Sequence, residues 1–224
     1  LSSQLEKAAE MLRKAERPAI VVGSQTLVNS RNPEEVADAL KHLGAPVWLG
    51  GMARGLLGRD SEIQYRHARG KALKEADVAI VCGFPFDFRL KYGLGFGKKT
   101  KVISANLSAE ELTKNRTPDL AVQLHPGEFL QQLSKRVRGP GNWSAWHSAC
   151  RQREDARDAE IRGKAKPAGE LVDPLHFFLR MEEKLADDSV LVADGGDFMA
   201  TAAYIVKPRK PLSWLDPGVF GTLG

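Results

Sequence analysis

Two glycine-containing segments near the end of the 224-residue chain have the residue types that bind phosphate groups. The first is Asp-Gly-Gly-Asp-Phe at 194–198, directly after an apolar, strand-like run at 189–193. At the carboxyl end of a parallel strand, glycines let backbone N–H groups approach diphosphate oxygens. The second is Gly-Val-Phe-Gly-Thr-Leu-Gly at 218–224. Taken alone, the first segment is better explained as an ordinary turn that needs glycine for its backbone angles.

A second group of candidate residues lies in the first half of the chain, in the segments 50–58 and 65–67. These segments contain Arg54 and Arg66, whose guanidinium groups suit phosphate oxygens. A flexible loop with solvated arginines explains each of them equally well. His67 has no second ligand residue at a metal-binding spacing, so we interpret it as a surface or packing histidine.

Two further candidates follow apolar runs. Gly83 comes directly after the run 78–82, where it allows a close turn at the end of a strand. Asp87 and Arg89 lie shortly after it, and we expect them to pair with each other. Asn106 follows the run 101–104.

Short apolar runs alternate with helical patterns over residues 1–137, which predicts an α/β domain with a Rossmann-like, doubly wound parallel sheet. Strands are expected at 19–22, 46–49, 78–82, 101–104 and 120–124. Helices are expected at 3–15, from 33 to the glycine at 44, at 71–77, after Ser108 and from 126. Asn32 should cap the second of these helices, and Ser108 should form a capping box with Glu111.

Residues 138–170 are expected to form a linker, whose helix at 143–166 is so highly charged that we predict a solvated surface helix. A helix at 174–186 and the strand at 189–193 then begin a second α/β domain over 171–224. We expect this second domain to be truncated, so that the chain is a middle piece of a larger protein.

Composition excludes several classes of function. Hydrophobic residues are 42% and charged residues 27%, as in ordinary globular domains. Two cysteines provide neither a disulfide framework nor a zinc site. The net charge of +5 is compatible with anionic small ligands, but with aromatics at only 7% and no basic stripe we expect no nucleic-acid partner.

The order of the 194–198 and 218–224 segments resembles the opening of the cofactor domain in thiamine-diphosphate (ThDP) enzymes, in the acetolactate synthase-like and 2-hydroxyacyl-CoA lyase branch. Residues 1–137 then resemble the central domain of that family. The resemblance implies that ThDP contacts Gly196, Asp197 and Phe198 through its diphosphate. It further implies that Gly221, Thr222 and Leu223 support the cofactor, with Leu223 beneath the thiazolium ring.

The same resemblance implies a magnesium ion, whose motif is expected beyond Gly224, and a catalytic glutamate outside this chain, so no catalytic residue is assigned here. In relatives the central domain faces FAD, ADP or the CoA nucleotide, which makes Arg54, Arg66, Gly83 and Asn106 candidate contacts. Asn106 stands where many relatives have an acidic residue that holds a ribose hydroxyl. This difference weakens the prediction of FAD or ADP and leaves open CoA, a different pose of the nucleotide, or a vestigial site.

The resemblance implies a 2-hydroxyacyl-CoA lyase-like enzyme that cleaves a carbon–carbon bond. We expect this chain to be inactive on its own. Acetolactate synthase-like carboligation of 2-oxo acids is the first alternative. A non-catalytic Rossmann-type module that binds a nucleotide or CoA is the second. The resemblance also implies a homodimer or homotetramer. The compartment stays open: cytoplasmic for a bacterial protein, or associated with the endoplasmic reticulum membrane for a vertebrate-type one.

Overall fold

The computed structural model describes residues 1–30, 32–167, 171–216 and 218. A six-stranded sheet in the order β3-β2-β1-β4-β5-β6 forms the larger part, and every neighbouring pair of its strands is parallel. This confirms the predicted doubly wound α/β fold. The strands are β1 (Pro18–Val22), β2 (Val47–Leu49), β3 (Gln64–Tyr65), β4 (Val78–Cys82), β5 (Lys101–Asn106) and β6 (Leu120–Gln123).

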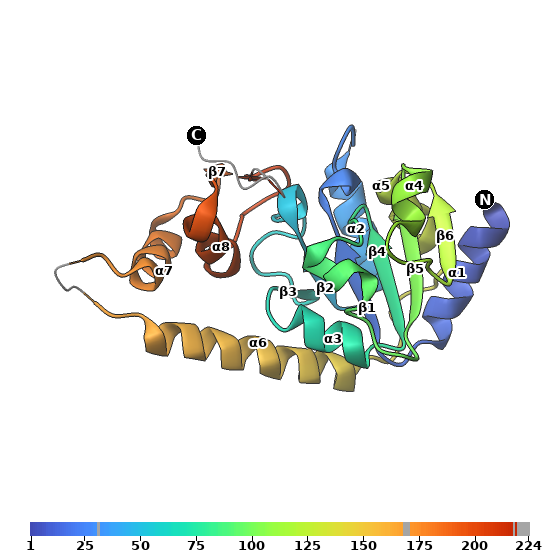
Figure 1. The fold of residues 1–224 in the computed structure, drawn as a ribbon, viewed down its shortest axis with the longest axis horizontal. Helices are drawn as coiled ribbons and strands as arrows, with labels where there is room; N and C mark the ends of the chain where they lie inside the picture. The colour runs from blue at the N-terminus through green and yellow to red at the C-terminus, as the bar shows by residue number, and fades with distance from the viewer. Residues whose placement is uncertain (31, 168–170, 217, 219–224) are drawn as a thin grey trace.

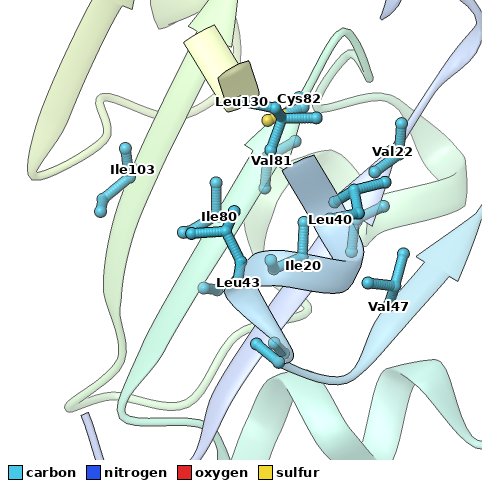
Figure 2. Packing of buried hydrophobic residues seen from close by; sticks show 14 of the residues in the cluster. Ile20, Val22, Leu40, Leu43, Val47, Ile80, Val81, Cys82, Ile103 and Leu130 are labelled. Atoms are coloured by element: carbon cyan, nitrogen blue, oxygen red, sulfur yellow. The ribbon is translucent and has the colours of Figure 1, made fainter. Parts of the chain in front are cut away.

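The centre of the sheet is the pair β1 and β4, and all ten of their residues are buried. Ile20 lies opposite Ile80 in this pair, in a register that runs from Pro18↔Val78 to Val22↔Cys82. Figure 2 shows these side chains packed against residues of neighbouring helices, including Leu40 and Leu130. Burial on both faces is the reason why these strands are apolar throughout instead of alternating.

Helices cover both faces of the sheet (Figure 1). On one face α1 (Ser2–Lys14), α2 (Pro33–Leu43) and α5 (Pro126–Ser134) pack against one another. The connections through α3 (Arg69–Glu75) and α4 (Ala109–Thr113) run over the opposite face, as right-handed crossovers from a reversed strand order require. Short 3₁₀ turns follow three strands: η1 (Ser24–Thr26), η2 (Gly51–Ala53) and η3 (Phe88–Gly93).

The predicted helix caps are present. The side chain of Asn32 accepts a hydrogen bond from the Glu35 N–H at 3.3 Å, and Ser108 Oγ accepts one from the Glu111 N–H at 3.2 Å. Gly44 ends α2 in the left-handed conformation, with φ of 66°. These local signals therefore determine where α2 and α4 begin and where α2 ends.

The charged helix is largely solvated, as predicted, but the prediction missed a stripe of it that is buried. Helix α6 (Ser144–Lys164) extends from beneath the sheet toward the second part of the chain (Figure 1). Trp146 is buried and donates from Nε1 to the Pro18 carbonyl at 2.9 Å. Glu154 is only 3% exposed, and its carboxylate accepts the backbone N–H groups of Arg66 and His67 at 2.8–3.1 Å. A narrow buried stripe therefore runs along α6, although its sequence is mostly charged.

The second part of the chain is a small β-α-β unit. Its elements are α7 (Pro174–Lys184), β7 (Leu191–Val192), α8 (Gly196–Ile205) and β8 (Trp214–Leu215), with β7 and β8 parallel. The ladder of β7 is shorter than the apolar run at 189–193 suggested. This unit has its own buried cluster, formed by Ile161, Phe178, Ala202, Ile205, Val206 and Trp214. Among the described residues, no helix combines the length and apolar character needed to cross a bilayer.

The buried carboxylate of Glu154 gives a first prediction. Glu154→Ala should lower the free energy of unfolding by about 3–5 kcal/mol, because it leaves two backbone N–H groups and part of the Arg66 charge without a partner. Urea denaturation measures the change. Glu160→Ala on the exposed face of the same helix is the matched control and should have little effect. Equal effects of the two substitutions would contradict a role for Glu154 in docking α6.

Candidate functional site

A cleft lies where the strand order reverses, between the carboxyl ends of β1 and β4. It has a volume of about 240 Å³ and is lined by Gly23 after β1, Gly50 after β2, Gly83 after β4 and Asn106 at the end of β5. We call it the switch-point cleft. In open α/β sheets, ligands bind at this position because the connections diverge to opposite faces and leave a crevice.

The backbone at the two central strand ends approaches too closely for any side chain but hydrogen. A Cβ on Gly23 would lie 2.3 Å from the Gly83 carbonyl oxygen. Gly83 has φ of +60°, and a Cβ there would lie 2.8 Å from the backbone nitrogen of Thr26. Glycine is therefore required at both positions. The sequence analysis identified Gly83 but missed Gly23, although both follow apolar strands directly.

Two arginines pack on Phe84, whose ring lines the cleft. Arg89 lies 4.6 Å and Arg69 5.3 Å from the ring centroid, measured from the guanidinium carbon. Arg89 pairs with Asp87 at 2.7 Å, which confirms the predicted pairing. Burial, with the positive charges of Arg54 and Arg89, lowers the pKa of Arg69 to about 10. An anion bound beside these groups would relieve their mutual repulsion.

Arg54 lies near these arginines but extends toward the second unit. Its Nη1 is 3.4 Å from the carboxylate of Asp216, and its guanidinium lies 5.5 Å from the centroid of Trp214. Trp214 donates from Nε1 to the same Asp216 oxygen at 2.7 Å. Burial lowers the pKa of Arg54, and the nearby charge of Arg89 lowers it further, while Asp216 opposes the shift. Arg54 therefore joins the loop after β2 to β8.

Arg66 does not line the switch-point cleft. Its guanidinium pairs with Glu154 at 3.2 Å and with Asp158 at 3.1 Å. A phosphate contact by Arg66 stays a prediction that this geometry does not favour, because both acids already hold the side chain.

His67 is buried and not a surface histidine, which corrects one half of its interpretation. Its Nε2 donates to Asp158 Oδ1 at 3.0 Å, across 91 positions of sequence. Burial opposes ionisation of Asp158, but the hydrogen bond from His67 and the charge of Arg66 lower its pKa overall. Ligand atoms of His67, Glu154 and Asp158 lie within 4.8 Å of one another. Arg66 occupies both carboxylates, so this cluster is a structural network joining α6 to the sheet.

The 194–198 segment forms the turn from β7 into α8. Gly195 is the N-cap residue, and Gly196 begins α8 with φ of +78°. No side chain among the described residues caps this helix, so the first-turn N–H groups of Gly196, Asp197 and Phe198 are available to an anion. This donor set fits a diphosphate. Gly221, Thr222 and Leu223 lie outside the described residues.

Comparison with known proteins agrees with this architecture. The family model for the thiamine pyrophosphate enzyme central domain matches residues 5–133, more than half of the chain. The chain belongs to the thiamine pyrophosphate enzyme family. Thiamine pyrophosphate is another name for ThDP, so the resemblance stated from the sequence is confirmed.

Two kinds of relative match almost the whole chain. The 2-hydroxyacyl-CoA lyase 2 of Caenorhabditis elegans is 39% identical over 100% of the chain, and that of Homo sapiens is 41% identical over 99%. The acetolactate synthase large subunit of Mycobacterium tuberculosis is 32% identical over 98%. The chain spans 36% of the length of the lyases and 40% of that of the synthase. It therefore corresponds to little more than a third of these relatives.

The contact between Arg54 and Asp216 gives a second prediction. Arg54→Met should destabilise the packing of β8 against the loop after β2, by about 1–3 kcal/mol, because it leaves the Asp216 carboxylate largely buried without its cation. Limited proteolysis within 207–216 and thermal unfolding measure the effect. Arg59→Met, in the same loop but with exposed acidic partners, is the control and should change neither. Resistance to protease unchanged by Arg54→Met would contradict the joining role.

Proposed function

We propose that this chain is the central part of a ThDP- and Mg²⁺-dependent lyase that cleaves a carbon–carbon bond in a 2-hydroxyacyl-CoA. The main support is the identity of about 40% to proteins named 2-hydroxyacyl-CoA lyase 2, which extends through both units of the chain. Within such an enzyme the chain contributes the switch-point cleft and the first loop of the cofactor site.

The 194–198 turn is the part of this chain that would hold ThDP. When bound, ThDP supplies a thiazolium ring that accepts the electron pair released as the carbon–carbon bond breaks. The residues of the chain would bind and orient it: the first-turn N–H groups of α8 would hold the diphosphate, and the helix dipole would favour its negative charge. Mg²⁺ would neutralise the remaining charge, through ligands that we do not assign to any described residue.

The switch-point cleft would bind the nucleotide end of a ligand. Its position at the strand ends and the arginines around Phe84 both favour a phosphate-bearing group. A 2-hydroxyacyl-CoA carries such a group on its adenosine end. The family resemblance also allows FAD or ADP, bound as a fixed nucleotide, as the occupant of this cleft.

Acetolactate synthase-like carboligation is the second candidate, since a synthase matches 98% of the chain at 32% identity. The two activities differ in their substrate. A lyase of the proposed kind consumes a 2-hydroxyacyl-CoA, whereas the synthase reaction joins 2-oxo acids.

Activity of the full-length protein that carries this chain provides a third prediction. With ThDP and Mg²⁺ it should consume a 2-hydroxyacyl-CoA and should form no acetolactate from pyruvate at a comparable rate. Chromatography of the CoA species and a colorimetric acetolactate assay measure the two reactions. A preparation without ThDP is the control. Acetolactate formation that outpaces consumption of the thioester would favour the synthase alternative.

Binding of ThDP by the 224-residue chain itself provides a fourth prediction. Among the described residues, the one cluster with metal-ligand geometry is His67, Glu154 and Asp158, and it is no part of the 194–198 turn. We therefore expect ThDP with Mg²⁺ to bind more weakly than a Kd of about 1 μM, or −8 kcal/mol. Isothermal titration calorimetry measures the affinity. Micromolar or tighter binding would mean that the turn and its neighbours suffice without further ligands.

A further inference from the structure

Arg66 holds more than the two acids of α6. Its side chain is 15% exposed, and each nitrogen of its guanidinium donates to a different group. Nε donates to Glu154 at 3.2 Å and Nη2 to Asp158 at 3.1 Å. Nη1 donates to the backbone carbonyl of Ile205 at 3.2 Å, across 139 positions of sequence. Ile205 is buried and is the last residue of α8, so the guanidinium joins the segment after β3 to both α6 and α8.

This contact suits the end of the helix at which it occurs. The last carbonyl groups of a helix have no partner within it, and the helix dipole places partial negative charge there. An arginine supplies both a donor and a positive charge. The opposite end of α8 is the 194–198 turn, whose uncapped N–H groups fit a diphosphate. Arg66 therefore holds one end of the helix whose other end is the candidate contact for ThDP.

The remaining contacts of α8 come mainly from its own unit and are apolar. The ring of Phe198 packs on that of Phe178 in α7, with 6.1 Å between the ring centroids. Among the hydrogen bonds between described residues, that of Arg66 with Ile205 is the one that connects α8 to residues 1–137. Apolar packing is non-directional, whereas this bond fixes a position. The placement of α8 relative to the sheet therefore depends on Arg66.

We propose that Arg66 is a positioning residue for the cofactor. By fixing the carboxyl end of α8, it sets where the N–H groups of the first turn meet the diphosphate of ThDP. The ten residues of α8 form a rod of about 15 Å, so a tilt at one end displaces the other. The inference rests on the proposal that the 194–198 turn holds ThDP, and it adds a residue of the central domain that controls how well the turn does so.

Arg66→Lys in the full-length protein that carries this chain tests the role. Lysine keeps a positive charge beside both acids, so the fold should persist, but its compact ammonium group cannot reach three acceptors arranged around a planar fork. In the cofactor-free protein, hydrogen–deuterium exchange of the α8 amides should become at least about tenfold faster, because a hydrogen bond from a charged donor is lost. In calorimetry at saturating Mg²⁺, the Kd of ThDP should rise at least about tenfold, because a positioned site tolerates little displacement.

Arg153→Lys is the matched control. Arg153 lies on the same helix α6, with a side chain that is 21% exposed, and pairs with Glu75 at 2.7 Å. Its partners among the described residues lie on α3 and α6, so the substitution weakens the docking of α6 without touching α8. Exchange of the α8 amides and the Kd of ThDP should both stay unchanged. Equal responses of the two variants would mean that Arg66 only stabilises the docking of α6, and would overturn the proposal.

Asp158→Asn covers the case in which Arg66→Lys does not fold. The side chain of Asp158 is 30% exposed, so loss of its charge costs less than at Glu154, which is 4% exposed. The substitution removes the charged acceptor of Nη2 and loosens the guanidinium. The exchange rate of α8 and the Kd of ThDP should then rise about threefold or more, since a neutral acceptor replaces a charged one.

The remaining outcomes are also decisive. If ThDP binds the unsubstituted protein and its Kd does not respond to Arg66→Lys, the positioning role is wrong, even where exchange of α8 becomes faster. If ThDP does not bind the unsubstituted full-length protein, the proposed cofactor role of the turn is itself wrong, and the positioning role is wrong with it.

Discussion

The pairing of β1 with β4 is the interaction on which the rest of the structure depends. Both strands are buried along their whole length, and their register brings Val22 and Cys82 to the same edge of the sheet. The chain then turns to opposite faces after each strand, so a crevice opens at these strand ends, where Gly23 and Gly83 lie in close contact and form part of its lining. The position of the candidate site is thus a consequence of topology.

The attachment of the second unit depends on polar groups buried in unusual places. Helix α6 contributes Glu154, which accepts the N–H groups of Arg66 and His67, directly after the edge strand β3, and pairs with the Arg66 guanidinium. Arg54 and Asp216 make a second connection at β8. Both connections rely on buried charge. Removing one partner of either pair leaves the other charge buried and unpaired, which lowers the stability strongly.

Much of the fold could be predicted from the sequence, because buried parallel strands are uniformly apolar and helix caps are local. The strand at 78–82 was predicted to the residue, and the caps at Asn32 and Ser108 are as expected. The two-residue strands β3 and β8 could not be predicted, since so short a ladder exists only through its tertiary partner. Prediction from local sequence patterns likewise fails where two residues in contact are far apart in the sequence.

Arg54 and His67 show the same limit at the candidate site. The partner of Arg54 is 162 positions away and that of His67 is 91, so neither contact leaves a signal in local spacing. From the sequence alone, Arg54 and Arg66 were each explained equally well as solvated side chains or as phosphate-binding groups. The structure gives each of them a carboxylate partner, Asp216 for Arg54 and Glu154 for Arg66. Burial and the charge of Arg89 lower the pKa of Arg54, and Asp216 raises it. The Arg54 guanidinium thus experiences the positive charge of Arg89 near the cleft and the negative charge of Asp216, which directly follows β8.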